Sequence, residues 1–444
     1  MSTVRTAWYV LSVSLFAASP AVAQQVVDPH AQHQHAGHEA MTLFPAREAS
    51  GTAWLPESTP MFGVMRTWGP WTAMMHGNLF VQVLYEPGEI HRTGGFSETQ
   101  ASSINWGMLM VRRPLGSGRL GFRGMLSLEP LTVPGCGYLN LLASGEVCDG
   151  DTIHDRQHPH DFMMELAAEY ERPLGNALRW QLYAGLAGEP ALGPVAFPHR
   201  LSTIANPTAP IAHHWLDSTH IVYGVITTGV FTKTWKAEAS VFNGREPDEH
   251  RWDLDLGALD SFSGRLTFAP APEWALQVSA ARLEESEEGI GEHPERTDVK
   301  RATGSATYHS TSAERTWATT LAWGFNSEEE REPTGVFTAK TNAVMLESTL
   351  MLRDAHTWFA RGEIAEKPAH DLHAHEYPEA IFTVGKAQLG YARSFRSWKG
   401  LVPSVGGSFT LNFVPEALEV QYDGRVRPGF AVFMSVRPAR HQMN

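Results

Sequence analysis

The chain has 444 residues, with 48 acidic and 35 basic side chains and a formal net charge of −13. This charge argues against sequence-independent binding of nucleic acid, which needs a basic surface to displace counterions. Two cysteines cannot build a disulfide scaffold or a four-thiolate zinc site. A mean hydropathy of −0.23 is too polar for a helical membrane protein, and 10% aromatic residues are too many for a disordered chain.

Residues 1–23 have the pattern of a secretory signal peptide. Arg5 provides a positive charge, residues 8–18 are apolar, and Ala21-Val22-Ala23 forms a small-residue cleavage site before Gln24. The apolar run is too short to span a bilayer. We therefore expect export to the periplasm or to the outer membrane.

Residues 24–67 follow as a histidine-rich, largely disordered periplasmic segment. Four histidines and Met41 lie in residues 28–41; the histidines are His30, His33, His35 and His38. Imidazole and thioether groups suit copper, and imidazole alone suits zinc or nickel. The stretch resembles the His- and Met-rich tails of outer-membrane proteins of the copper-resistance protein B kind, which implies a role in copper handling. A disordered spacer without a metal role is the alternative.

Between residues 68 and 438 the chain alternates apolar and polar residues with a period of two, which predicts β-strands. Residues 178–188 show the pattern, and residues 161–172 place Phe162, Met164 and Leu166 on one face and Glu165 on the other. The strands are expected near residues 71–85, 102–113, 118–130, 161–172, 178–188, 217–232, 235–243, 261–269, 274–284, 298–310, 315–326, 341–352, 356–366, 380–394, 401–413 and 427–437.

The connections between these segments alternate strictly between short and long, and tryptophans collect at the start of alternate strands. The tryptophans are Trp71, Trp180, Trp235, Trp274, Trp317, Trp358 and Trp398. Both features are typical of membrane barrels, where indoles favour the headgroup level. The chain resembles the porin-like outer-membrane β-barrels of Gram-negative bacteria. That resemblance implies an all-β, closed antiparallel barrel of about 16 strands (range 12–16), with short periplasmic turns and long extracellular loops. The tail at 439–444 departs from the family, many of whose members end on an aromatic residue at the last strand. A soluble β-sandwich or propeller is the alternative.

The polar faces of the strands supply candidate lumen-lining residues: His76, Arg119, Arg123, Glu165, Glu169, Lys236, Glu238, Arg361 and Glu363. Charges of both signs around a wide barrel can shape the field of an aqueous channel. They can equally pair with one another and fill a closed lumen. The sequence leaves both readings open.

Cys136 and Cys148 fall in one long loop of an exported chain, which predicts a disulfide. Thiolate ligation of a metal is the minor alternative.

Histidines gather in the loops on one side of the predicted barrel. The candidate metal ligands at this extracellular rim are His154, His158, His160, His199, His213, Asp217 and His220. Imidazoles with a nearby carboxylate suit copper or zinc, which are the cofactors we expect. In a helix, His213, Asp217 and His220 would share one face. The alternative is that these side chains only make polar loop contacts.

From these patterns we predict an outer-membrane channel or transporter that handles transition metals. Its expected partners are outer-membrane lipid and small solutes or metal ions; an oligomer is compatible with the sequence, and nucleic acid is not a partner. One alternative is a membrane-embedded, metal-dependent hydrolase or lipase with the rim His/Asp cluster as its site. Another is a structural or adhesive barrel.

Overall fold

The computed structural model describes residues 47, 49–87, 98–287, 297–332, 335–374, 376–377 and 379–441. The predicted signal peptide and the tail histidines lie outside these residues. In the described part, no helix is long and apolar enough to cross a membrane.

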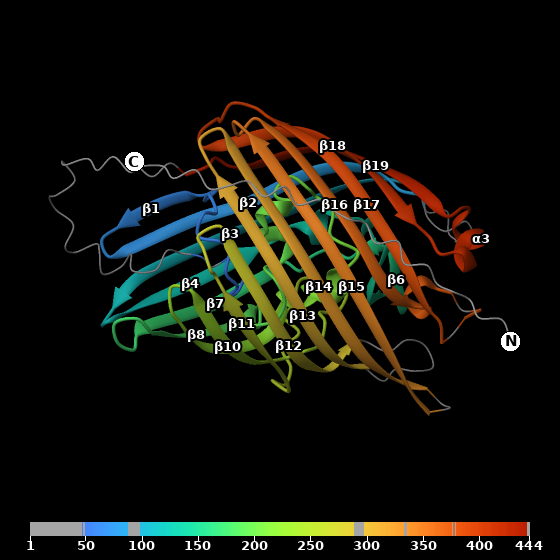
Figure 1. The fold of residues 1–444 in the computed structure, drawn as a ribbon, viewed down its shortest axis with the longest axis horizontal. Helices are drawn as coiled ribbons and strands as arrows, with labels where there is room; N and C mark the ends of the chain where they lie inside the picture. Colours follow the sequence, from blue (N-terminus) through green and yellow to red (C-terminus); the bar gives the residue numbers. More distant parts are fainter. Residues whose placement is uncertain are drawn as a thin grey trace. The chain divides into compact units, whose positions relative to one another are not determined.

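Sixteen antiparallel strands close into a barrel, as the sequence predicted, and each pairs with the next in chain order except where a loop hairpin intervenes. Figure 1 shows red β19 returning beside the blue β2, where the pairs run from Phe430–Tyr85 to Val436–Leu79 and complete the ring. The wall strands are β2 (Trp71–Tyr85), β3 (Thr99–Leu115), β4 (Gly118–Leu126), β7 (Met163–Pro173), β8 (Arg179–Gly188), β9 (Val222–Phe231), β10 (Trp235–Phe242), β11 (Ser261–Phe268), β12 (Trp274–Glu287), β13 (Thr297–Thr311), β14 (Arg315–Glu332), β15 (Gly335–Leu352), β16 (His356–Pro368), β17 (Ile381–Ser394), β18 (Leu401–Phe413) and β19 (Val426–Pro438).

Apolar side chains cover the outside of the wall because one face of each strand points away from the lumen. Leu266, Val278, Ile364, Leu389 and Val432 are all more than half exposed there. The seven predicted tryptophans lie at the end of the barrel that carries the short turns, and Trp398 is 67% exposed. We call this end the turn end and the opposite one the loop end.

The closing strands are joined a second time at the turn end. The short strand β1 (Val64–Trp68) pairs with the first residues of β2. Phe62 forms an isolated bridge with Arg440, and the His441 amide donates to the Met61 carbonyl. Residues 440 and 441, just beyond the last strand, are therefore fastened to residues 61 and 62 at the start of the barrel.

At the loop end, the connections are mostly long and folded. They contain the short helices α1 (Glu129–Thr132), η2 (Phe197–His199), η3 (Leu201–Thr203), α2 (His213–Leu216), η4 (Ser218–His220), η5 (His370–Leu372), η6 (Glu416–Leu418) and α3 (Glu419–Tyr422). Residues 327–340, predicted as a loop, differ from that prediction because β14 and β15 extend through most of them.

Three segments of the chain enter the barrel. We name them the amino-terminal segment (residues 49–63), the hairpin loop (127–162) and the inner loop (189–221). Figure 1 shows the green ribbon of the inner loop between the near and far walls. The amino-terminal segment differs from the sequence prediction, which placed residues 24–67 in a largely disordered periplasmic region. Its described part is held within the barrel by wall side chains such as Arg123 and Lys236.

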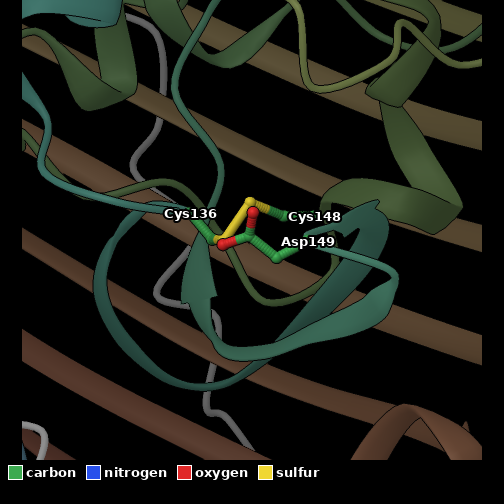
Figure 2. Close-up of side chains that lie close together, drawn as sticks. All are labelled: Cys136, Cys148 and Asp149. Atoms are coloured by element: carbon green, nitrogen blue, oxygen red, sulfur yellow. A yellow bond between two sulfur atoms is a disulfide. The ribbon is translucent and has the colours of Figure 1, made fainter.

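The hairpin loop carries its own two-stranded sheet, β5 (Tyr138–Cys148) with β6 (Asp151–Gln157). Figure 2 shows the disulfide between Cys136 and Cys148, with Asp149 beside it. The predicted disulfide is confirmed, and it joins a residue just before β5 to the last residue of that strand, next to the turn into β6. Because both sulfurs are in that bond, neither cysteine is a thiolate ligand.

The strand β7 departs from simple alternation where it begins. β7 starts at Met163, and its register with β4 shifts between Met125 and Leu126, so Glu165 pairs with Met125 and Met163 with Leu126. The extra residue, Met164, is buried. The sequence had placed Met164 on the outward face with Leu166, but the bulge turns it inward.

Replacing both cysteines by serine should loosen the hairpin loop and leave the barrel intact. In the chain-entropy model, a ring of this size contributes on the order of 3 kcal/mol. Hydrogen exchange should therefore accelerate across β5 and β6 and stay unchanged across β13 to β15, which serve as the internal control. Equal protection of β5 and β6 in both proteins would show that the disulfide is not what orders the loop.

Candidate functional site

The inner loop runs through the lumen and is bonded to strands on several sides of the wall. The Ala191 and Gly193 amides donate to Ser240 of β10 and Ser279 of β12. The Ala212 amide donates to Glu363 of β16, and Asn78 of β2 donates to the Ile204 carbonyl. A polypeptide in a closed barrel must have its backbone groups satisfied, and here the wall side chains satisfy them.

A buried ion-pair network fixes the middle of this loop. Arg200 lies 2.6 Å from an Asp217 oxygen within the loop and 2.5 Å from a Glu347 oxygen of β15. Arg361 of β16 pairs with the other Glu347 oxygen at 3.2 Å and donates to the Thr208 carbonyl. These charges therefore tie the loop to two adjacent strands.

The amino-terminal segment is held in a similar way. Arg123 donates to the carbonyls of Gly51 and Ala49, at 2.6 and 2.9 Å. Lys236 donates to the Thr52 carbonyl. The Ala196 amide donates to Ser50 at 2.9 Å, so this segment and the inner loop also contact each other.

The predicted lumen-lining charges all point inward, and each has a partner there. Arg123 lies 3.0 Å from Glu165 and 3.7 Å from Glu169, Arg119 lies 3.3 Å from Glu171, and Lys236 lies 3.2 Å from Glu238. Of the two readings left open by the sequence, the structure favours charges that pair and bind inserted chain.

Five histidines gather where the hairpin loop meets the inner loop. We call them the histidine cluster: His158, His160, His213, His214 and His220. Their ring centroids are 5.5 Å apart for His213–His214, 5.2 Å for His213–His220 and 5.3 Å for His160–His220. His158 lies 6.1 Å from His213 and 6.2 Å from His214. The rings thus form a connected series.

Each ring of the cluster has its Nδ1 next to an acceptor. The partners of His160 and His213 are Glu129 and Asp217, both at 2.9 Å. His220 faces the Asp217 carbonyl at 2.8 Å. The other two rings, of His158 and His214, face Glu146 and Glu246 at 3.1 and 3.0 Å. A proton held on Nδ1 leaves Nε2 as the basic nitrogen, which is how carboxylates orient metal-binding histidines.

The pKa values of the cluster histidines are shifted in different directions. Burial lowers the pKa of His158, His213 and His220, and Asp217 only partly opposes this for His213. Burial also lowers the pKa of His160, but the Glu129 carboxylate outweighs it and the net shift is upward. Most of the cluster is therefore neutral near pH 7, as metal binding requires.

The other predicted rim residues lie elsewhere. His154 of β6 lies against His373, with ring centroids 3.6 Å apart and the rings tilted by 39°. His199 lies deep in the lumen beside His76, 5.7 Å between centroids. The predicted set is therefore divided into three places, and only His158, His160, His213, Asp217 and His220 are brought together.

No three members of the histidine cluster present ligand atoms within 4.8 Å of one another. In the described chain, two groups of His, Cys, Asp or Glu meet that distance: Cys136, Cys148 and Asp149, and Asp248, Asp253 and Asp255. The first contains the disulfide, and the second is an acidic group in the connection after β10. The histidine cluster is thus spaced as a series of ligands more than as one closed site.

Sequence reasoning missed His214 and the carboxylates Glu129, Glu146 and Glu246 as parts of this site. His214 is adjacent to His213 in the sequence, and this adjacency could have identified it as a candidate ligand. Glu129 and Glu146 lie in the hairpin loop and Glu246 in the connection after β10, and only the folded loops bring them to the imidazoles. Nothing in their spacing signals that arrangement.

No protein-family profile matches this chain, and no curated protein matches its sequence. Solved structures do match in fold. The outer-membrane channel DcaP of Acinetobacter baumannii aligns with a TM-score of 0.50 at 10% identity, over 85% of this chain and 100% of that one. The fold is that of the bacterial porins.

Two further porins align over similar lengths. The anion-selective porin from Comamonas acidovorans has a TM-score of 0.48 at 12% identity, over 83% of this chain and 99% of its own. Salmonella typhi OmpF, solved with daunomycin, has 0.49 at 9% identity, over 84% and 100%. The closed barrel and its apolar exterior place the protein in the bacterial outer membrane.

The Arg200 network predicts how firmly the inner loop is held. Glu347→Gln leaves Arg200 with one carboxylate, and breaking a buried pair costs on the order of 3 kcal/mol, about a hundredfold in local opening. Hydrogen exchange over residues 189–221 should accelerate accordingly. Glu314→Gln, which breaks an exposed pair with Arg353, is the control and should have no effect. Unchanged exchange in Glu347→Gln would contradict the assignment.

Acidification should also release the inner loop. His158, His199, His213 and His220 have lowered pKa values when buried, so an opened loop takes up protons below pH about 6.5. The closed conformation of the inner loop is therefore most stable above pH about 6.5, and it loses stability as the pH falls below that value. His160, with a raised pKa, acts in the opposite direction.

The measurement is hydrogen exchange of residues 189–221 at pH about 7.5 and about 5.0, corrected for intrinsic rates. A His213→Gln/His220→Gln variant should lose part of the pH response. A loop equally protected at both pH values would show that these imidazoles do not control it.

Proposed function

We propose that this protein is an outer-membrane channel for small divalent transition-metal ions such as zinc or copper. The observation that carries the proposal is the histidine cluster, in which five Nδ1 atoms face acceptors and the rings follow one another at 5.2–6.2 Å. Conduction needs binding that is favourable enough to admit an ion and weak enough to release it. A series of imidazoles without a closed three-ligand site fits that need.

The filled lumen supports a small permeant. The inner loop, the hairpin loop and the amino-terminal segment occupy space that a general porin leaves to water, and large side chains among them, such as Trp215 and Tyr138, are buried. A hydrated ion passes more easily through such an interior than a sugar or a peptide does.

Charge around the cluster favours a cation. Glu129, Glu146, Asp217 and Glu246 each contact a cluster imidazole. Two of these carboxylates also pair with arginines, Asp217 with Arg200 and Glu146 with Arg251. Of the remaining two, Glu129 faces His160, whose pKa it raises, and Glu246 supplies negative charge that a bound divalent ion can neutralise.

Ion flux tests the proposal directly. The full-length protein in liposomes loaded with a zinc-sensitive dye should admit Zn²⁺ faster than empty liposomes. A His213→Gln/His220→Gln variant should slow Zn²⁺ entry by on the order of tenfold, which is the scale of the effect when metal ligands or their partners are lost. Glucose entry should stay near the empty-liposome rate.

The matched control is His309→Gln. His309 is a buried histidine on the lumen face of β13 that contacts Thr59 and stands outside the cluster. Its variant should conduct zinc like the parent protein. Zinc entry at the rate of empty liposomes, or equal entry through the parent and the cluster variant, would overturn the proposal.

A further inference from the structure

Three adjacent wall strands place a histidine and two methionines in a row on the lumen face. His76 of β2 is the register partner of Met108 of β3, and Met108 is the register partner of Met125 of β4. Because the three residues are direct cross-strand neighbours, their side chains share one face at short range. Met108 and Met125 are buried.

His199 of the inner loop completes this group from the lumen side. Its Nε2 lies 3.3 Å from Met125 Sδ, while His76 Nε2 lies 3.1 Å from Met108 Sδ. The two rings are 5.7 Å apart and tilted at 58°. Two imidazole nitrogens and two thioether sulfurs therefore meet as two nitrogen–sulfur pairs.

These separations fit two ligands of one ion as well as they fit hydrogen bonds to sulfur. A thioether sulfur is a weak acceptor and gives a buried imidazole little stabilisation. With metal–nitrogen bonds near 2.0 Å and metal–sulfur bonds near 2.3 Å, two ligands of one tetrahedral ion are about 3.5 Å apart. The observed 3.1 and 3.3 Å are close to that spacing.

The surroundings favour an ion of low charge. Met110 and Met164 are buried beside the group, and Trp106 packs on His199 with centroids 4.6 Å apart. Arg123, two residues before Met125 on β4, is balanced by Glu165 and Glu169. Burying charge in apolar surroundings is costly, so four neutral ligands suit a monovalent ion.

We propose that His76, Met108, Met125 and His199 form a binding site for Cu(I). Thioether ligands select soft ions such as Cu(I), whereas the carboxylate-flanked histidine cluster suits divalent ions. The site deepens the proposed function, on which it rests, by naming a second ionic species and a separate place in the lumen. In this site His199 is grouped with His76, Met108 and Met125, whereas the sequence pattern had grouped it with the rim histidines.

The test compares Cu(I) binding by the full-length parent and a Met108→Leu/Met125→Leu variant, refolded in detergent under reducing, anaerobic conditions. Leucine keeps the volume and apolar character of methionine and removes the sulfur. Competition with the Cu(I) chelator bicinchoninate should show that the variant binds about one equivalent less, or binds that equivalent 10–100-fold more weakly. Residues 28–41 are present in both proteins, so their contribution cancels in the difference.

Met351→Leu is the matched control, because Met351 is a buried lumen methionine packed against Leu201 and Ala318. It should bind Cu(I) like the parent. His76→Gln tests the imidazole half and should reproduce the loss, with the heat-dependent gel shift of folded barrels confirming that each variant is folded.

Equal Cu(I) stoichiometry and affinity in the parent, the double methionine variant and His76→Gln would overturn the site and leave the methionines as apolar packing. Zinc flux separates this result from the proposed function. A protein that conducts zinc through the histidine cluster but shows no Cu(I) difference refutes this inference alone, whereas one that conducts no zinc refutes the proposed function.

Discussion

The structure depends on one buried interaction, the contact of Arg200 with Asp217 of its own loop and Glu347 of the wall. A guanidinium in the interior must keep its carboxylates, since losing one leaves an uncompensated charge. Asp217 also orients His213. The residue that anchors the inner loop is therefore electrostatically linked to the histidine cluster. Loop position and imidazole orientation are set by the same carboxylate.

Close backbone approach is the second requirement of this filled interior. Gly324 of β14 lies against Trp215, where an added Cβ would be 2.3 Å from the Trp215 carbonyl oxygen. The Trp215 indole donates to Thr341 of β15 at 2.8 Å. A glycine in the wall thus lets the α2 helix pack directly on the strands, and the histidines on that helix gain a fixed position.

The wall was predictable from the sequence because period-two alternation and tryptophans such as Trp235 and Trp274 report on each strand separately. The lumen contents were not. Arg123 binds the carbonyls of Gly51 and Ala49, and a backbone acceptor has no signature in the sequence. His76 and His199 meet only because a loop folds inward past several strands. The bulge that turns Met164 inward also breaks the period on which the prediction relied.

The bridge between Phe62 and Arg440 has a consequence for assembly. The ring is closed by the pairing of β19 with β2, and residues 49–63 lie inside that ring while Phe62 bridges Arg440. Closure therefore joins the most distant parts of the described chain in one event. Such long-range pairing is intrinsically slow. The closed wall thus depends on a contact between strands that lie at opposite ends of the described chain.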